Sequence, residues 1–89
     1  MTNLNMNRNN ICPICGYPNL QYPAYDDYGC PSSEICSCCG TEFGYHDASK
    51  THEELRKKWL DEGMLWFSQE RKPSTWNAIN QLKSIGVEI

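Results

Sequence analysis

Two cysteine pairs are the residues of this chain whose types and spacing could do chemistry. Each pair forms a Cys-x-x-Cys turn that is followed at once by glycine, as in Cys12-Pro13-Ile14-Cys15-Gly16 and Cys36-Ser37-Cys38-Cys39-Gly40. Twenty residues separate Cys15 from Cys36. Two such pairs supply the four thiolates that a closed tetrahedral zinc site requires. The pattern therefore predicts one metal ion held by Cys12, Cys15, Cys36 and Cys39.

The glycine that follows each turn indicates which cysteines are the ligands. A knuckle of this kind curls its backbone so that main-chain N–H groups point at the sulfurs and stabilise the thiolates. The next residue is then driven to positive φ, which glycine adopts without steric cost. Because Gly40 follows Cys39, Cys38 is expected to point away from the ion, and Cys30 has no partner at knuckle spacing.

Four further residues could touch the metal or act beside it. Cys30 and Cys38 are expected to be unligated thiols, although a replacement ligand or a redox pair stays open for them. His46 and His52 are possible ligands by type, but four cysteines already complete the tetrahedron. A site closed in this way leaves no position for water or substrate, so hydrolytic chemistry is not expected.

The chain length and the cysteine content are typical of a small domain that a bound metal ion stabilises. The chain has 89 residues with 39% hydrophobic and 21% charged side chains, which predicts one small folded domain. A core of this size is marginal, and a structural zinc ion contributes on the order of 10 kcal/mol. The Asn-rich start lacks the apolar run of a secretory signal and no stretch could span a membrane, so we expect a cytoplasmic protein with reduced thiols.

The charge distribution argues against a nucleic-acid partner. The net charge is −3, and residues 1–50 carry two basic and five acidic side chains, while residues 51–89 carry six of each. Zinc held by four thiolates adds about two negative charges to the first half. Binding to a phosphate backbone needs a basic surface, which neither half provides.

The elements that must position the cysteines are short. Residues 1–10 are expected to be a flexible tail and residues 11–89 a single domain, in which residues 11–46 hold both turns. Residues 33–35 and 41–45 read as the arms of a short antiparallel hairpin, with Phe43 and Tyr45 on one face.

Two helices are expected after the knuckles. Thr51 and Glu54 form a capping box for a helix over residues 51–69. A second helix is expected over residues 74–85, begun by Ser74 and ended by Gly86, with Val87 as a hydrophobic clasp beyond it.

The first of these helices is predicted to carry an aromatic face. At 100° per residue, Trp59, Trp66 and Phe67 fall on one wide apolar arc. This arc is either buried by the ribbon and the second helix, or it is the surface for an unknown protein partner or a homodimer.

The motifs also resemble known families. The doubled Cys-x-x-Cys-Gly knuckle resembles the rubredoxin-like zinc ribbons. The strings Cys-Pro-Ile-Cys-Gly-Tyr, Glu-Ile-Cys-Ser-Cys-Cys-Gly-Thr-Glu-Phe-Gly-Tyr and His-Glu-Glu-Leu-Arg-Lys-Lys-Trp are similar to small, mostly bacterial cysteine-rich proteins of the CPCC type. The likeness covers residues 11–68, although neither turn of this chain reads Cys-Pro-Cys-Cys.

The resemblance implies a small α+β metal-bound domain, a rubredoxin-like zinc ribbon with two knuckles and short antiparallel strands followed by two C-terminal helices. The expected function is a structural-zinc binding module with a protein-interaction or adaptor role. We expect no enzyme activity, because the chain shows no nucleophile–base pair, phosphate loop or paired carboxylates at catalytic spacing. The alternatives are a rubredoxin-like iron electron-transfer protein, since four sulfurs also hold iron, and a nucleic-acid-binding zinc ribbon.

Overall fold

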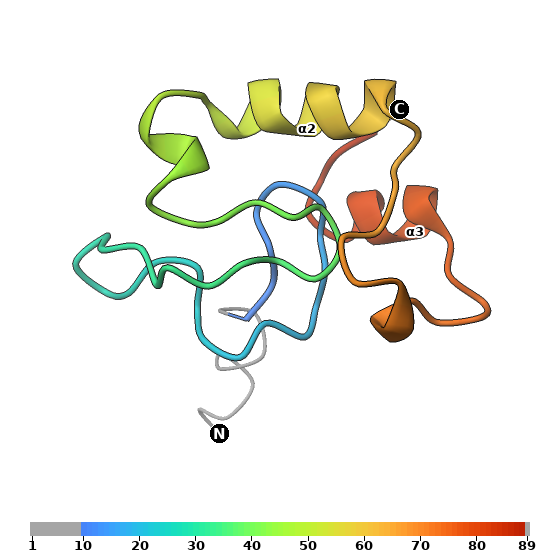
Figure 1. Ribbon diagram of the computed structural model, residues 1–89, viewed down its shortest axis with the longest axis horizontal. Helices are drawn as coiled ribbons and strands as arrows, with labels where there is room; N and C mark the ends of the chain where they lie inside the picture. The colour runs from blue at the N-terminus through green and yellow to red at the C-terminus, as the bar shows by residue number, and fades with distance from the viewer. Residues whose placement is uncertain (1–9, 89) are drawn as a thin grey trace.

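The two cysteine turns lie in the middle of the molecule, framed by the helices (Figure 1). The structure is a computed structural model and describes residues 10–88. The predicted tail, residues 1–10, lies outside the described residues except for Asn10. The helices, of which those marked η are of the 3-10 type, are η1 (His46–Ala48), α2 (His52–Asp61), η2 (Gln69–Arg71) and α3 (Ala78–Lys83).

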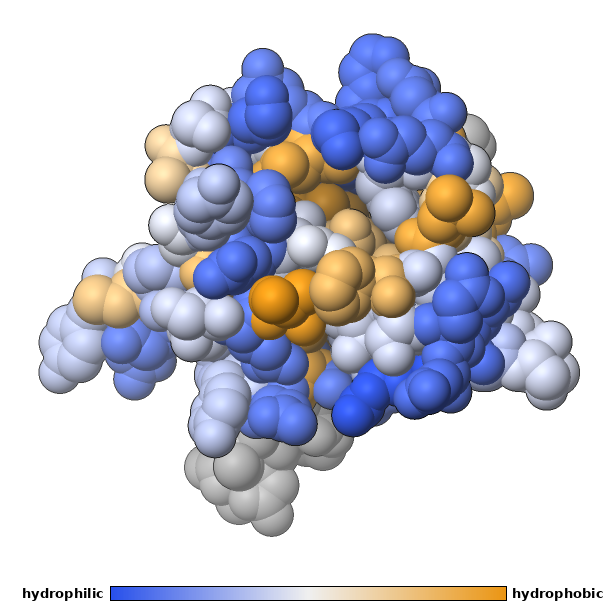
Figure 2. Space-filling model, viewed as in Figure 1, coloured by the Kyte–Doolittle hydropathy of each residue, from blue (hydrophilic) through white to orange (hydrophobic). Residues whose placement is uncertain are grey.

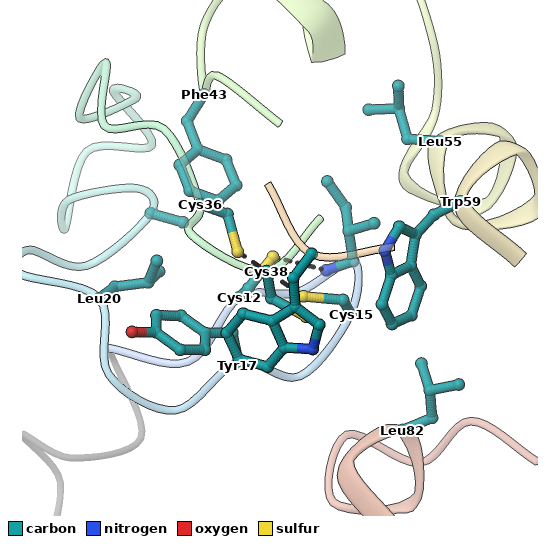
Figure 3. Packing of buried hydrophobic residues seen from close by; sticks show 13 residues of the cluster. Cys12, Cys15, Tyr17, Leu20, Cys36, Cys38, Phe43, Leu55, Trp59 and Leu82 are labelled. Atoms are coloured by element: carbon teal, nitrogen blue, oxygen red, sulfur yellow. Dashed lines mark hydrogen bonds between the residues drawn. The ribbon is translucent and has the colours of Figure 1, made fainter. Parts of the chain in front are cut away.

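The core is built from cysteine and aromatic side chains. Figure 3 shows the fully buried cysteines at its centre, with Leu55 and Trp59 reaching in from α2 and Leu82 from α3. Trp66 is also buried, and its ring lies edge-on to Tyr17 at a centroid distance of 5.6 Å. The two halves of the chain therefore share one core, and the cysteine turns are its middle.

The predicted antiparallel hairpin does not form, and the α+β ribbon fold class is wrong. Residues 10–88 contain no strand and no sheet; backbone pairing of that kind is limited to single bridges, Ile35 with Glu42 and Tyr25 with Pro31. Ser33 at φ 68° bends the first arm, and Gly44 at φ 99° turns the second arm towards η1. The backbone is instead a small domain of loops, two short α-helices and 3-10 turns.

The same turn separates two side chains that the hairpin prediction placed together. Phe43 is 1% exposed and lies in the core, whereas Tyr45 is 68% exposed. The N–H of His46 donates to the carbonyl of Glu42, so the backbone has already begun a helical turn at this point. The prediction that Phe43 and Tyr45 share a face is therefore wrong.

Helix α2 begins as predicted and ends eight residues early. The capping box of Thr51 and Glu54 is present in both directions. At the other end Gly63 adopts φ 96°, its N–H donates to the Leu60 carbonyl, and the N–H of Met64 donates to the Trp59 carbonyl. These two bonds form a Schellman motif, which ends a helix. The predicted helix over residues 51–69 is corrected to His52–Asp61.

Helix α3 is shorter than predicted at its start. Asn77, and not Ser74, is the N-cap, because its side chain accepts the N–H of Asn80. The predicted stop signal is present, since Gly86 adopts φ 82° and the N–H of Val87 donates to the Leu82 carbonyl, but the helix itself ends two residues earlier than predicted, at Lys83. The predicted helix over residues 74–85 is corrected to Ala78–Lys83. Within the described range, no helix combines the length and apolarity needed to cross a membrane.

Candidate metal centre

The structure brings the four predicted sulfurs together. The Sγ atoms of Cys12, Cys15, Cys36 and Cys39 all lie within 4.8 Å of one another. The Cys12 and Cys39 sulfurs are 3.8 Å apart, and those of Cys15 and Cys36 are 3.6 Å apart.

These spacings fit a metal cage. Zinc–sulfur bonds of about 2.3 Å in a tetrahedron place the sulfurs about 3.8 Å from one another. A disulfide would need about 2.05 Å, and all six cysteines are free. A group of four cysteines in this arrangement can hold a metal ion, and its donors suit zinc or iron.

The two knuckles are built in the same way. In the first, the N–H of Cys12 donates to the Tyr17 carbonyl and the N–H of Gly16 donates to the Cys12 carbonyl, at 2.8 and 2.9 Å. In the second, Cys36 pairs likewise with Thr41 and Gly40, at 2.9 Å each.

The conformation predicted for the two glycines is confirmed. Gly16 has φ 87° and Gly40 has φ 77°, the left-handed region that glycine takes without cost. The repeated sequence pattern therefore encodes a repeated backbone that points two sulfurs from each turn inward.

Polar groups from several parts of the chain support the sulfurs. The N–H of Ile14 donates to the Cys12 sulfur at 3.4 Å, and the hydroxyl of buried Thr41 lies 3.3 Å from the Cys39 sulfur. The guanidinium of Arg56 donates to the carbonyls of Pro13 and Ile14, at 2.9 and 2.7 Å. Arg56 thus fastens the first knuckle to α2 and brings a positive charge to the rim of a cage that becomes anionic when its thiols ionise.

The cage thiols are electrostatically unequal. Hydrogen bonding, first with Cys12, raises the pKa of Cys15 and Cys36 well above the ordinary thiol value, and burial adds to this. The pKa of Cys39 is lowered, because hydrogen bonds with Cys12, Cys15 and Cys36 stabilise its thiolate. A cation entering the cage therefore has to displace protons from Cys15 and Cys36.

The C-terminal residues cover both knuckles. The side-chain amide of Gln81 donates to the Cys15 carbonyl at 2.9 Å, and a Cβ placed on Gly16 would lie 2.4 Å from the Gln81 carbonyl oxygen. The N–H groups of Phe67 and Ser68 donate to the carbonyls of Cys38 and Ser37, at 3.0 and 2.8 Å.

Sequence reasoning missed the supporting roles of Thr41, Arg56 and Gln81. Arg56 and Gln81 lie more than forty positions from the knuckles that they touch. No local pattern could have indicated those contacts. Thr41 directly follows Gly40, so its position next to the second turn was the one available signal.

The other candidate residues lie outside the group of four sulfurs. Cys38 is fully buried with its sulfur 3.5 Å from the Gln81 amide nitrogen, and Cys30 is exposed. His46 accepts the N–H of Glu42 through Nδ1 at 2.9 Å. The Nε2 atom of His52 lies 2.7 Å from the Tyr25 hydroxyl, which also donates to Asp47.

The predicted aromatic face is divided by the early end of α2. Trp59 and Trp66 are each 5% exposed, and Trp66 lies on the loop that follows the helix. Phe67, on the same loop, is 64% exposed, and its N–H donates to the carbonyl of Cys38 in the second knuckle.

A comparison with curated proteins finds a relative in Bacillus subtilis (strain 168), described as the uncharacterized protein YoaQ. It is 35% identical over an alignment 88 positions long, which covers 81% of this chain and 75% of the relative. No protein-family model and no solved structure matches the chain. The comparisons therefore supply a family and no named activity.

Proposed function

This chain belongs to the same family as the YoaQ protein of Bacillus subtilis, and from that premise we propose that it is a small module folded around one structural zinc ion. The ligands are Cys12, Cys15, Cys36 and Cys39. The observation that carries the proposal is the mutual approach of their sulfurs to within 4.8 Å at the centre of the core. The likeness to rubredoxin-like and CPCC-type proteins supports the paired knuckles alone.

The bound ion would act by holding segments together. The first knuckle contacts α2 through Arg56 and α3 through Gln81, and the second contacts the 67–68 segment. Zinc would supply a charge that neutralises the thiolates and joins the two knuckles, and Cys12, Cys15, Cys36 and Cys39 would supply four sulfur ligands. This closed coordination supports a structural role without catalysis.

Charge and exposed apolar side chains support a protein partner over a nucleic acid. The chain carries a net charge of −3 before the thiolates are counted, which disfavours binding to phosphate backbones. Figure 2 shows apolar side chains exposed between hydrophilic ones, and Leu65 and Phe67 are 65% and 64% exposed on one short loop. Native mass measured against concentration tests for a second copy as partner, and nucleic acid is expected not to bind at low salt.

Metal analysis of matched alanine variants tests the proposal. Protein expressed in a reducing cytoplasm is expected to carry one equivalent of zinc and no colour, whereas an iron form would be red. Cys39→Ala is expected to lose the metal on dialysis against a chelator, and Cys38→Ala, one residue away and outside the cage, is expected to keep it. Retention of metal by both variants, or its absence from the unaltered protein, would contradict the proposal.

A further inference from the structure

The four cage residues differ in their exposure to solvent. Cys12, Cys15 and Cys36 are 0% exposed, whereas Cys39 is partly exposed. A ligand that exchanges with solution has to be reached by an incoming donor atom. Exposure therefore singles out Cys39 among the cage residues.

A cavity leads to this ligand. It has a volume of about 140 Å³ and lies between the second knuckle and α2, where Cys39 and Thr41 face Leu55, Lys58 and Trp59. A water molecule occupies about 30 Å³, so the cavity has room for a few waters or for one arm of a small chelator.

Protein covers the cage on the sides of Gln81, Ile14 and Phe43. Gln81 lies against the first knuckle, so closely that a Cβ on Gly16 would meet its carbonyl oxygen at 2.4 Å. Ile14 and Phe43, at 0% and 1% exposure, fill the space beside the buried cysteines, as the packing in Figure 3 illustrates for Phe43. Opening these sides would require core residues to move, whereas the Cys39 side is already hollow.

The rim of the cavity carries positive charge. Lys50 and Lys58 both line it, and both are exposed. Glu62 also lines the cavity and is paired with Lys58 at 3.0 Å, so these three side chains together leave one net positive charge, that of Lys50. Positive charge at the mouth of a small cavity raises the local concentration of anions.

We propose that Cys39 is the exchangeable ligand of the cage, and that small anionic chelators reach the metal through the cavity between the second knuckle and α2. This inference rests on the proposed metal site and adds to it a route and a class of exchange partner. In the exchange, the Cys39 sulfur gives up its bond to the ion and takes a proton, and a donor atom of the chelator takes the vacated position. Cys12, Cys15 and Cys36 release the ion afterwards.

Limited alkylation of the zinc-loaded protein tests the identity of the ligand. The variant Cys30→Ser is used, because exposed Cys30 would otherwise consume the reagent. Neutral iodoacetamide forms a sulfur–carbon bond and expels iodide, and peptide mapping then reports each cysteine. Cys39 is expected to be labelled well before the other three ligands, and equal labelling or an earlier reaction at Cys12, Cys15 or Cys36 would overturn the inference.

Two neighbouring lysines of α2 give a matched test of the route. Lys58 lines the cavity and pairs with Glu62, whereas Lys57 lies outside it and pairs with Asp61 in the same i,i+4 geometry, at 2.9 Å. Lys58→Trp is expected to slow zinc transfer to EDTA several-fold by narrowing the mouth, and Lys57→Trp is expected to leave it unchanged. Equal rates in the two variants would overturn the route.

The same pair tests the charge preference. Lys58→Glu is expected to slow zinc transfer to anionic EDTA more than Lys57→Glu does, while alkylation of Cys39 by neutral iodoacetamide stays unchanged. If Lys58→Glu and Lys57→Glu transfer zinc to EDTA at the same rate, the inferred preference for anionic chelators is wrong. The metal content of every sample is measured first: zinc bound with uniform labelling overturns this inference alone, and zinc not bound overturns it together with the proposed function.

Discussion

The side-chain amide of Gln81 donates a hydrogen bond to the carbonyl oxygen of Cys15 across 66 residues of sequence. The same side chain accepts the indole N–H of Trp76 through Oε1 at 2.9 Å. Gln81 therefore satisfies one polar group of the first knuckle and the indole N–H of Trp76, whose ring lies edge-on to Trp59 and Trp66. This contact connects α3 to the candidate metal site.

Replacing Gln81 by leucine is expected to destabilise the metal-loaded protein. The change leaves the Cys15 carbonyl and the Trp76 indole without this partner, and an unsatisfied buried polar group costs about 1–3 kcal/mol. Urea unfolding followed by tryptophan fluorescence measures the free energy of unfolding. Asn80→Ala, at an exposed neighbouring position, is the control, and a loss no larger than that of the control would contradict the role assigned to Gln81.

Alanine substitutions at two glycines with the same backbone conformation distinguish the cost of backbone strain from the cost of a steric clash. Gly16 and Gly29 have φ 87° and 82°, but a Cβ on Gly16 would lie 2.4 Å from the Gln81 carbonyl oxygen, and one on Gly29 would meet nothing within 4 Å. Gly29→Ala is expected to cost about 1–2 kcal/mol through conformation alone.

Gly16→Ala is expected to cost clearly more than Gly29→Ala, because α3 must move away from the knuckle. Thermal unfolding of both metal-loaded variants measures the difference. If the two variants lose the same stability, α3 does not press on the knuckle as the structure shows.

The sequence predicted the local geometry of the knuckles well. The positive φ of Gly16 and Gly40 and the approach of the four sulfurs follow from a repeated five-residue pattern. The capping box at Thr51 and the stop signal at Gly86 after α3 are equally local, since each depends on residues within one turn. Features of this kind are readable because the interacting residues are neighbours in sequence.

The predicted helix and strand boundaries were wrong where a local turn signal interrupted a periodic sequence pattern. The apolar spacing of Trp59, Trp66 and Phe67 continued a helix, but Gly63 offered a Schellman ending that the backbone adopts. The strands failed for a similar reason, since Gly44 and the turn into η1 interrupt the second arm. The supporting contacts of Arg56 and Gln81 depend on tertiary packing, which spacing alone cannot reveal.

Metal affinity is expected to fall as pH falls. Hydrogen bonding and burial raise the pKa of Cys15 and Cys36, so both keep their protons when no metal is bound, and protons compete with the ion for these sulfurs. The sign is fixed by this competition, because lower pH favours the protonated, metal-free cage. Competition with a chromophoric chelator across neutral and mildly acidic pH measures the affinity.

The variant Cys38→Ala is the control for this titration. Cys38 lies outside the group of four sulfurs, so its removal is expected to leave the pH dependence in place. An affinity that does not change with pH would show that the ion is not bound through thiols that must first lose protons.

A cluster outside the metal centre gives the last prediction. The Tyr25 hydroxyl donates to the Asp47 carboxylate and lies 2.7 Å from Nε2 of His52, so it joins the loop before the second knuckle to η1 and to the first turn of α2. Burial, with the carboxylate of Asp47 beside it, raises the pKa of Tyr25 and keeps the hydroxyl protonated as a donor. Tyr25→Phe removes these bonds with little change of shape, and it is expected to cost about 1–3 kcal/mol of unfolding free energy.

Tyr28→Phe is the matched control for this change, because Tyr28 is 90% exposed on the same loop. Tyr25→Phe is expected to lower the urea midpoint while the protein still binds one equivalent of metal, since Tyr25 contributes no sulfur to the cage. Equal midpoints for the two variants would mean that the cluster does not hold the loop against α2. Loss of metal in Tyr25→Phe alone would mean instead that the loop and the cage unfold together.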